Sequence, residues 1–383
     1  MSLGSSPGSG ALAPDPSASN TDLGMPALSE HHTPAEARAL TMRVAAIELV
    51  AETIRAVTLV NADGTPLPPF TAGAHINLKL PGDLSRSYSL TNGPETSDRY
   101  IIAVNRDAAS RGGSAYIAEQ LKVGDVLPVD PPHNTFPLVE AAELSAFFAG
   151  GIGITPILAM IRRLEALGRP WKLFYAARNR ASAAFVAELA ALEAAAPGRV
   201  HFHFDDEAGK VMPLLKLAMT IPKLAHVYCC GPGRMIETFK ASAGWRPEDN
   251  VHVEHFAGTN ARPTSDFTVA LKRQGGEFFV KAGESIMDVL EAHGIPVAHS
   301  CREGVCGTCE TVVLEGECDH KDNVLSRREK DSNKLIMICC SGARSGRSSS
   351  ISRFPAVPIL DPAPQRRVFC LRVKRDAGCT LSP

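Results

Sequence analysis

Apolar residues recur at about every second position over residues 41–50 and 53–60, which is the period of a half-buried β-strand. A turn sequence at residues 61–64 follows the second run, and another short apolar run lies at residues 100–104. Short strands at this spacing are typical of a small antiparallel structure. We therefore expect an antiparallel β-barrel over residues 39–138.

The pattern changes over residues 139–262, where strands, glycine turns and helices alternate. The expected strands are residues 144–149, 171–176, 200–204 and 226–230, and the expected helices are residues 156–167 and 181–196. Alternation of this kind predicts a parallel sheet with helices on its faces, that is, an α/β domain.

A third unit is expected over residues 263–345. Its first strand (267–271), a glycine turn and a second strand (277–280) form a hairpin, and residues 285–293 form a short helix with one apolar face. A mixed sheet with one helix suits a β-grasp ferredoxin. Residues 1–38, in contrast, are rich in Ser, Pro, Gly and Ala without an apolar period, so we expect a disordered extension there.

The overall composition is that of a soluble protein: the 383 residues are 44% hydrophobic and 21% charged, and the net charge is −1. A near-neutral chain argues against nucleic acid or an acidic membrane as its main partner. No apolar run reaches about 18 residues and the N-terminus lacks an apolar signal region, so we expect neither a membrane span nor a secretory signal. Ten cysteines, scattered or claimed by the motif below, favour a reducing cytoplasm.

Four cysteines near the C-terminus carry the most specific chemical signal: Cys301, Cys306, Cys309 and Cys339. They follow a C-x4-C-x2-C spacing, and 29 residues separate the third from the fourth. This is the plant-type [2Fe–2S] spacing, in which four thiolates hold two irons. A zinc site is the alternative, but zinc ligands tend to come in paired short C-x2-4-C units and this run does not divide that way.

The same region leaves one ligand ambiguous. Cys340 adjoins Cys339 and either thiol can be the fourth ligand; we choose Cys339 because it keeps the gap of 29 residues. Cys318 is expected to be a spare thiol. Gly304 and Gly307 allow the backbone of the loop to pass close to a cluster.

A candidate flavin site lies in the expected barrel and has two parts. The first part is a run at strand spacing: Arg86, Ser87, Tyr88 and Ser89. Here the tyrosine can lie against a flat ring while the hydroxyls bond its polar edge. The second part is a turn before a helical stretch: Gly112, Gly113 and Ser114. Backbone N–H groups of such a turn suit a phosphate. The alternative is an ordinary strand end and an ordinary helix cap.

A candidate nucleotide site lies in the α/β domain, between a buried strand and a helix. It consists of Gly150, Gly151, Gly153, Thr155 and Pro156. Glycines let the backbone approach a pyrophosphate, although this is not the G-x-G-x-x-G fingerprint. Cys230, Gly231 and Pro232 place a thiol and a sharp turn at the end of a later strand, where open α/β sheets bind ligands. Arg178 and Arg180 can contact a 2′-phosphate, but solvated arginines are the simpler interpretation.

Together these motifs resemble those of the phthalate dioxygenase reductase family, which includes the reductase components of vanillate O-demethylases. The resemblance covers roughly residues 40–345 and has the motifs in the order flavin, nicotinamide, iron–sulfur. It implies FMN as the flavin and NADH as the reductant. It also implies that residues 86–89 and 112–114 hold FMN, that the turn at 150–156 lines the NADH pyrophosphate, and that Cys230 and Phe256 lie near the two reacting rings.

The implied function is a reductase component of a Rieske-type aromatic oxygenase. NADH gives two electrons as a hydride and the cluster accepts one at a time, so the flavin acts between them. The oxygenase would dock transiently near residues 301–309, and the chain is expected to be a monomer. The alternatives are a reductase for another acceptor, such as a cytochrome or an amine-oxidising monooxygenase, and a plain electron carrier. The intact turn at 150–156 argues against the carrier.

The sequence departs from this family after the fourth cysteine. Where the family has a last apolar strand, this chain has hydroxyl residues at 348–350 and then a tail rich in Pro and Arg. We treat residues 346–383 as an atypical tail and hypothesise a shifted reading frame near residue 341, which resequencing of the DNA would test. If the tail is natural, we expect this edge of the ferredoxin sheet to be less well closed.

Overall fold

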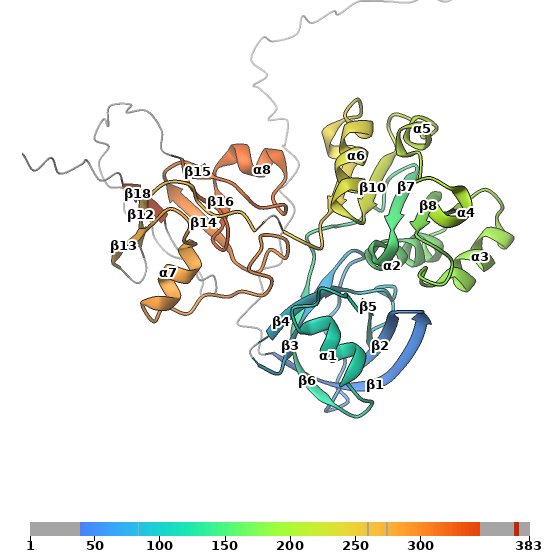
Figure 1. Cartoon of the computed structure of the whole chain (residues 1–383), viewed down its shortest axis with the longest axis horizontal. Coiled ribbons are helices and arrows are strands. Elements are labelled where there is room, and N and C mark those ends of the chain that lie inside the picture. Colours follow the sequence, from blue (N-terminus) through green and yellow to red (C-terminus); the bar gives the residue numbers. More distant parts are fainter. Residues whose placement is uncertain (1–38, 83, 259, 273–274, 345–370, 375–383) are drawn as a thin grey trace, which may run out of the picture.

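The computed structural model describes residues 39–344, apart from residues 83, 259 and 273–274, and in addition residues 371–374 (Figure 1). The predictions for residues 1–38 and for most of the tail lie outside this described part. Three units follow one another along the chain, which we call the barrel unit, the α/β unit and the cysteine-loop unit. In Figure 1 they form three lobes, with the barrel unit below the α/β unit and the cysteine-loop unit to one side.

The barrel unit is a six-stranded antiparallel sheet with the order β4-β3-β6-β1-β2-β5. Its strands are β1 (Leu40–Ala51), β2 (Ile54–Asn61), β3 (His75–Leu80), β4 (Leu84–Ser89), β5 (Tyr100–Asn105) and β6 (Val126–His133), and its helix is α1 (Gly113–Glu119). Leu90, just after β4, bridges to Ile102 of β5, which brings the two end strands together. The period-two apolar residues fill the interior, where Val44, Leu59 and Ile76 are fully buried.

The α/β unit is a five-stranded parallel sheet with the order β11-β10-β7-β8-β9. Its strands are β7 (Ser145–Gly150), β8 (Trp171–Ala177), β9 (Val200–Phe204), β10 (His226–Cys230) and β11 (Val251–Glu254). Its helices are η1 (Gly151–Gly153), α2 (Ile154–Ala166), α3 (Val186–Ala195), α4 (Asp205–Ala208), α5 (Leu214–Met219), α6 (Gly233–Ala243) and η2 (Glu248–Asn250).

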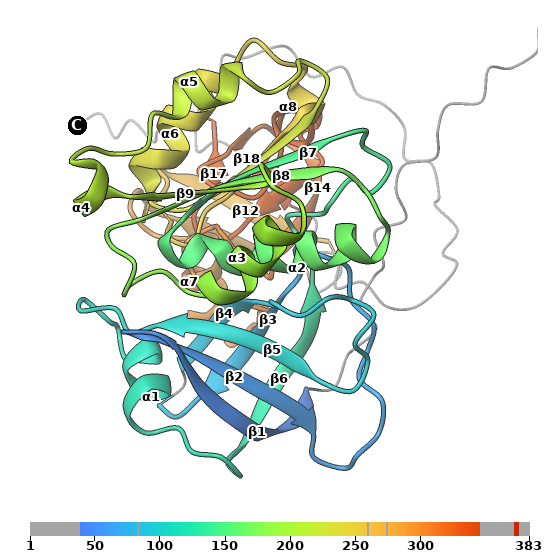
Figure 2. The same cartoon turned by 90° about the vertical axis from the view of Figure 1, so that its right-hand side faces the viewer.

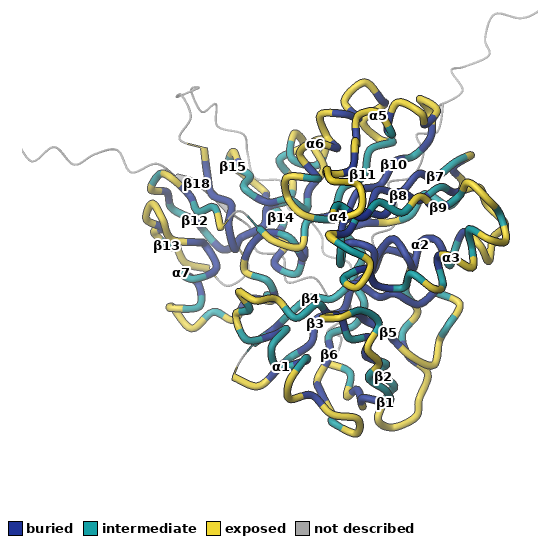
Figure 3. Tube along the Cα trace, turned by 45° about the vertical axis from the view of Figure 1, so that its right-hand side comes forward, coloured by how far each residue is buried: buried dark blue, intermediate teal, exposed yellow. Residues whose placement is uncertain are grey.

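Helices cover both faces of this parallel sheet (Figure 2). Phe147 of β7 packs into the core under α2 and α3, whereas its neighbour Phe148 packs into the core under α5 and α6. Every residue of β7 is buried, and most of α2 is buried too, as the dark blue trace in Figure 3 shows. A strand buried on both faces reads as a continuous apolar run, which is why residues 144–149 were recognisable in the sequence.

One expected helix is shorter than the sequence pattern indicated. The alanine-rich stretch predicted a helix from residue 181, but α3 begins at Val186. The preceding residues form a turn, in which the backbone N–H of Ser182 donates to Asn179 Oδ1 at 2.8 Å. Phe185 then has a positive φ of 60°, which is incompatible with continuing a helix backwards.

The cysteine-loop unit is a five-stranded sheet with the order β13-β12-β18-β14-β16, together with a two-stranded sheet of β15 and β17. Its elements are β12 (Phe267–Leu271), β13 (Glu277–Val280), α7 (Ile286–Ala292), β14 (Glu310–Glu315), β15 (Cys318–Asp319), α8 (Arg327–Ser332), β16 (Leu335–Met337), β17 (Gly342–Ala343) and β18 (Leu371–Lys374). Ser285 caps α7 by accepting the N–H of Asp288 at 3.0 Å, which explains where this helix begins.

The tail contributes one strand that the sequence analysis did not predict. The backbone of β18 lies between β12 and β14, antiparallel to the first and parallel to the second. We expected the ferredoxin sheet to be less well closed if the tail is natural. This expectation is wrong between β12 and β14, where β18 completes the sheet. The facing edges of β12 and β14 have backbone N–H and C=O groups that need hydrogen-bond partners. A third strand between them provides these partners, wherever it lies in the sequence.

Within the described part of the chain, every helix is too short or too polar to cross a lipid bilayer.

Candidate redox centre

The loop between α7 and β14 brings three of the predicted ligand cysteines together, and the segment before β17 supplies the fourth. Cys306 Sγ accepts the backbone N–H of Cys301 at 3.5 Å. The Cys301 thiol also interacts with that of Cys339, which in turn interacts with the thiol of Cys309. Hydrogen bonding with the Cys301 thiol, together with burial, raises the pKa of Cys306. Four thiols that converge in this way fit the four thiolate ligands of a [2Fe–2S] cluster.

The glycines of this loop are required by its shape. Gly304 and Gly307 have φ values of +71° and +74°, in the left-handed region that favours glycine. A Cβ on Gly304 would lie 2.5 Å from Cys340 Sγ, and a Cβ on Gly307 would lie 2.9 Å from Thr135 Cγ2 of the barrel unit. The loop is therefore packed closely against both its own unit and the barrel.

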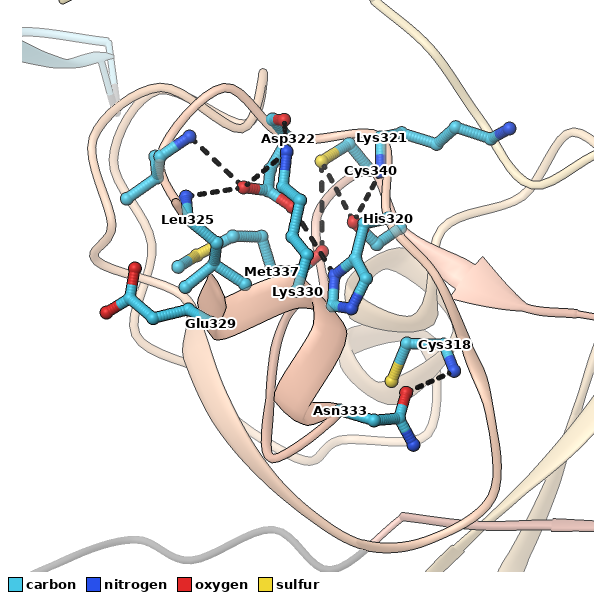
Figure 4. Close-up of polar contacts among 12 residues, drawn as sticks. Cys318, His320, Lys321, Asp322, Leu325, Glu329, Lys330, Asn333, Met337 and Cys340 are labelled. Atoms are coloured by element: carbon cyan, nitrogen blue, oxygen red, sulfur yellow. Dashed lines mark hydrogen bonds and ion pairs between the residues drawn. The ribbon is translucent and has the colours of Figure 1, made fainter. Parts of the chain in front are cut away.

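The thiols of the two adjacent cysteines interact with each other, but their other neighbours differ. Cys339 Sγ lies among the thiols of Cys301 and Cys309, as described above. Cys340 Sγ instead lies 3.8 Å from the carbonyl oxygen of Met337, towards which it donates, and 3.7 Å from Ser341 Oγ (Figure 4). The contacts of Cys339 with Cys301 and Cys309 favour Cys339 over Cys340 as the predicted fourth ligand.

A buried polar cluster supports the segment around Cys340 (Figure 4). Asp322 Oδ1 accepts the backbone N–H groups of Val324 at 3.1 Å and Leu325 at 2.8 Å, and Lys330 lies 3.7 Å away. Burial alone would raise the pKa of Asp322, but the interaction with His320, whose Nδ1 lies 3.6 Å from Asp322 Oδ2, and the hydrogen bonds from these N–H groups lower it overall. The carboxylate is thus held ionised in the interior, where it stiffens the turn that packs on Gly304.

The two parts of the predicted flavin site, 25 residues apart in sequence, are neighbours in the structure. Arg86 Nη2 on β4 donates to the carbonyl oxygen of Arg111 at 2.9 Å. A Cβ on Gly113 would lie 2.6 Å from Arg86 Cγ, so the arginine side chain lies directly over the glycine turn. A guanidinium beside backbone N–H groups fits a phosphate.

Other predicted flavin residues have partners of their own. Tyr88 packs against the barrel core, and burial raises its pKa to about 12. The Ser114 hydroxyl donates to Ser110 Oγ at 2.9 Å, and the same oxygen accepts the N–H of Gly112 at 3.2 Å. Ser110 was missed in the sequence, because nothing in its spacing distinguishes it from an ordinary loop serine. Ser89 is buried at the end of β4.

The predicted nucleotide residues also come together from two distant segments. A Cβ on Gly153 would lie 2.2 Å from the carbonyl oxygen of Cys230, and a Cβ on Gly150 would lie 2.7 Å from Pro232 Cδ. The two glycine turns therefore touch at the carboxyl edge of β7 and β10, where parallel sheets bind ligands. Thr155 is buried and its hydroxyl donates to the carbonyl of Ile152 at 3.0 Å, which tightens the turn.

A buried acid accompanies the thiol at this edge. Cys230 Sγ lies 3.8 Å from Glu254 Oε2 at the end of β11. Burial raises the pKa of Glu254 to about 8 and holds the pKa of Cys230 well above its ordinary value. Both groups are therefore mainly uncharged at neutral pH. Phe256, two residues on, is 42% exposed, so its ring is accessible to a bound molecule.

The structure favours the simpler interpretation of Arg180. Its guanidinium donates to Glu207 at 2.6 Å and 3.1 Å and lies over the ring of Phe204, at 4.5 Å from the ring centroid. An arginine held by a carboxylate is less available to a 2′-phosphate, which agrees with NADH rather than NADPH.

The barrel turn and the cysteine loop are joined directly. Glu303, between the first two predicted ligand cysteines, forms an ion pair with Arg111 of the glycine turn. Its other oxygen accepts the backbone N–H of Gly258 at 3.4 Å. The Glu303 carboxylate is buried and the Arg111 side chain is exposed, so the ion pair lies at the edge of the contact between the barrel unit and the cysteine loop. It links the candidate flavin site to the candidate cluster site. Sequence spacing carried no signal for it, because 192 residues separate the partners.

Comparisons with known proteins agree with this arrangement. Residues 269–344 match the family model of the 2Fe-2S iron-sulfur cluster binding domain, and residues 147–241 match that of the oxidoreductase NAD-binding domain. The chain is 47% identical over 312 residues to tetrachlorobenzoquinone reductase of Sphingobium chlorophenolicum, covering 80% of this chain and 96% of that one. It is 39% identical over 316 residues to phthalate dioxygenase reductase of Burkholderia cepacia, covering 82% and 97%.

Solved structures give the same result. A structure titled phthalate dioxygenase reductase, a modular structure for electron transfer from pyridine nucleotides to [2Fe-2S], matches with a TM-score of 0.61 and 39% identity. The match covers 80% of this chain and 96% of that one. An intact type IV self-sufficient cytochrome P450 monooxygenase matches with a TM-score of 0.74 and 38% identity; this chain spans only 40% of that longer protein.

Fold and sites thus define a modular oxidoreductase that combines an antiparallel flavin barrel, an NAD-binding domain and a [2Fe–2S] domain. The chain belongs to the phthalate dioxygenase reductase family, as its identity to members over nearly their whole length shows. It is a reductase of the kind that serves oxygenase systems.

Proposed function

We propose that this protein passes electrons from NADH through FMN and a [2Fe–2S] cluster to a separate Rieske-type oxygenase. The observation that carries the proposal is the Arg111–Glu303 ion pair, which joins the candidate FMN turn to the cluster loop. Electron transfer requires the two cofactors to lie close together. The Arg111–Glu303 ion pair holds the two sites that would bind them next to each other. The bound cofactors supply the redox chemistry: NADH gives two electrons at once, the cluster takes one, and the flavin handles both.

Each group of residues has a separate task in this proposal. Cys301, Cys306, Cys309 and Cys339 hold the cluster. Arg86, Ser87, Tyr88 and Ser89, with Gly112, Gly113 and Ser114, hold FMN. Gly150, Gly151, Gly153, Thr155 and Pro156, with Gly231 and Pro232, leave room for the NADH pyrophosphate.

The groups beside the reacting rings are Cys230 and Phe256, and their setting suits a hydride step. The neutral pair of Cys230 and Glu254 adds no charge to the place where the nicotinamide would lie. The exposed ring of Phe256 can stack on the flavin ring until NADH binds. No side chain has to act as a general acid or base, because the protein's task is orientation.

We also infer the surroundings of the reaction. The oxygenase would dock briefly beside residues 301–309, and the reductase would act as a monomer. A cytoplasmic location is supported by the cysteines, since the eight that the structure describes are all free.

Anaerobic stopped-flow mixing with NADH tests the proposal. We expect bleaching of the flavin absorbance, followed by the electron paramagnetic resonance (EPR) signal of a reduced [2Fe–2S] cluster. Cys309→Ser is the matched control, because it should bleach normally and give no cluster signal. A protein that contains FMN and is not bleached by NADH would refute the proposal.

Direct reduction of a quinone is a second candidate function, favoured by the 47% identity to tetrachlorobenzoquinone reductase. A quinone can take two electrons from the flavin and so does not need the cluster. The Cys309→Ser variant separates the two functions. If it keeps NADH-dependent quinone reduction but no longer supports an oxygenase, both activities belong to this chain; loss of quinone reduction would exclude a flavin-based quinone activity.

A further inference from the structure

One polar face of the barrel unit meets the cysteine loop. On β3, Ile76, Leu78 and Leu80 point into the barrel core, so the alternate residues Asn77 and Lys79 lie on the opposite face. The cross-strand partners of those two residues on β4 are Ser87 and Ser85. These four side chains are polar, although Asn77 and Ser85 are buried at 4% and 9% exposure, because the cysteine loop covers them.

Hydrogen bonds run from this face to a predicted cluster ligand. The Ser87 hydroxyl donates to Asn77 Oδ1 at 2.6 Å, and Asn77 Nδ2 donates to Thr308 Oγ1 at 3.2 Å. Thr308 Oγ1 lies 3.2 Å from Cys306 Sγ. Three side chains of two different units thus connect the candidate flavin strand to a sulfur that holds the cluster.

The direction of this series is determined by its chemistry. Asn77 Oδ1 is occupied by the Ser87 hydroxyl, so the amide side that reaches Thr308 is the N–H donor. Thr308 Oγ1 accepts that N–H, which leaves its own O–H to find an acceptor. In the free thiol Cys306 donates to Thr308. A thiolate ligand has no proton, so the Thr308 hydroxyl must then be the donor to the sulfur.

A second connection holds the two units in register. Ser300, which precedes the first ligand cysteine, is 5% exposed, and its Oγ lies 3.1 Å from Ser85 Oγ and 3.1 Å from Ser87 Oγ. Lys79 Nζ lies 3.4 Å from Ser85 Oγ and 2.9 Å from Asp130 of β6. The position of Asn77 relative to Thr308 is therefore fixed from both sides.

We propose that Asn77 of the barrel unit is a positioning residue for the cluster: it aims the Thr308 hydroxyl at Cys306 Sγ, so that the flavin-binding unit itself helps to set the reduction potential of the cluster. The proposal rests on the proposed function, since it requires the cluster to be present. Hydrogen bonds to cluster sulfurs are among the factors that move the potential of such centres. The reduced cluster carries one more negative charge, so a donor to its sulfur stabilises the reduced form and raises the potential.

The alternative is that the Asn77–Thr308 hydrogen bond only holds the barrel unit and the cysteine-loop unit together. It would affect how firmly the units associate, but the potential of a correctly assembled cluster would stay the same. The two roles are therefore separated by measuring the potential rather than the activity.

EPR-monitored redox titration of the complete protein tests the proposal in three variants. Thr308→Val keeps the shape but removes the hydroxyl, Asn77→Leu keeps the approximate size but removes the amide donor, and Thr308→Ser keeps the hydroxyl as the matched control. We expect Thr308→Val to lower the equilibrium constant for reduction of the cluster about tenfold. This corresponds to a reduction potential that is lower by ~59 mV for one electron. Asn77→Leu should also lower the reduction potential. Thr308→Ser, which keeps the hydroxyl, should have the same potential as the unsubstituted protein.

The double variant provides an independent check. If Asn77 acts through Thr308, then Asn77→Leu combined with Thr308→Val should shift the potential no further than Thr308→Val alone. A cluster signal of normal intensity with an unshifted potential in Thr308→Val would overturn the proposal. If Asn77→Leu does not fold, Asn77→Asp takes its place, because aspartate keeps the size and the acceptor oxygen but lacks the amide donor. A protein that never gives a cluster signal, even unsubstituted, would instead overturn the proposed function.

Discussion

Replacing Gly153 by alanine is expected to weaken NADH binding and hydride transfer strongly. The added Cβ would lie 2.2 Å from the carbonyl oxygen and 2.4 Å from the carbonyl carbon of Cys230. Both atoms belong to the backbone of a central strand, so no flexible side chain can give way. The glycine turn must then move by about 1 Å, and overpacking of this kind costs typically about 1–3 kcal/mol of folding free energy.

The functional loss should exceed the loss of stability. A displacement of about 1 Å at a reacting site can lower a rate by roughly a hundredfold, because the reacting atoms no longer meet in line. The moved turn lies at the sheet edge where the nicotinamide would be held beside Cys230. We therefore expect flavin bleaching by NADH, measured by anaerobic stopped flow at several NADH concentrations, to slow by about two orders of magnitude.

Gly168, just after α2, is the matched control, because it lies in the same unit and has no part in the predicted site. It has a φ of +62°, and a Cβ there would meet no atom within 4 Å. Gly168→Ala should therefore cost only the left-handed backbone strain of about 1–2 kcal/mol, without a steric clash. If Gly153→Ala is reduced by NADH as fast as Gly168→Ala, the contact between the two glycine turns does not control the site and the reasoning is refuted.

Three further predictions concern single side chains. Cys339→Ser should abolish the cluster, whereas Cys340→Ser should retain it, as iron and sulfide analysis with EPR would show; the reverse result would transfer the ligand to Cys340. Burial raises the pKa of Glu254 from 4.5 to about 8, so the native state binds a proton that the unfolded state has lost between these values. The contribution of Glu254 to stability should therefore fall by roughly 1.4 kcal/mol per pH unit as the pH rises through that window. Glu254→Gln should remove this contribution, so the difference in unfolding free energy between the unsubstituted protein and the variant should change by that amount per pH unit in urea unfolding at several pH values. A difference that stays constant with pH would contradict the assignment. Arg246 is buried and donates to the carbonyls of Ala218 and Ile221, each at 2.8 Å, so Arg246→Met should lower the free energy of unfolding by about 3 kcal/mol, and a loss below 1 kcal/mol would show that these bonds are replaced.

Much of the architecture was predictable because its signals are local. The period-two pattern of β1 and β2 and the continuous apolar run of β7 reflect how each strand is buried, on one face or on both. The cysteine spacing is local for the same reason, since three ligands lie on one loop. The glycine turns at 112–113 and 150–153 were visible because glycine is needed where φ is positive or where backbones touch.

Elements with a weak pattern were not predicted. Short α5 and the four-residue strands β11 and β18 show a period only weakly over so few residues, whereas the equally short β13 was predicted because a glycine turn pairs it with β12. Their structure is determined by the sheet or helix beside them. The position of β18 between β12 and β14 is decided by the free edges of those two strands.

The sequence by itself determined which chemistry this protein can carry: four thiols for a cluster, an arginine and a glycine turn for a phosphate, and a second glycine turn for a dinucleotide. Only the tertiary structure decided how these sites are connected. Glu303 meets Arg111, Asn77 meets Thr308, and Gly153 meets Cys230 across separations of 77 residues or more. Such contacts depend on how folded units dock, and docking is determined by surface shape and polar complementarity, which leave no period in the sequence.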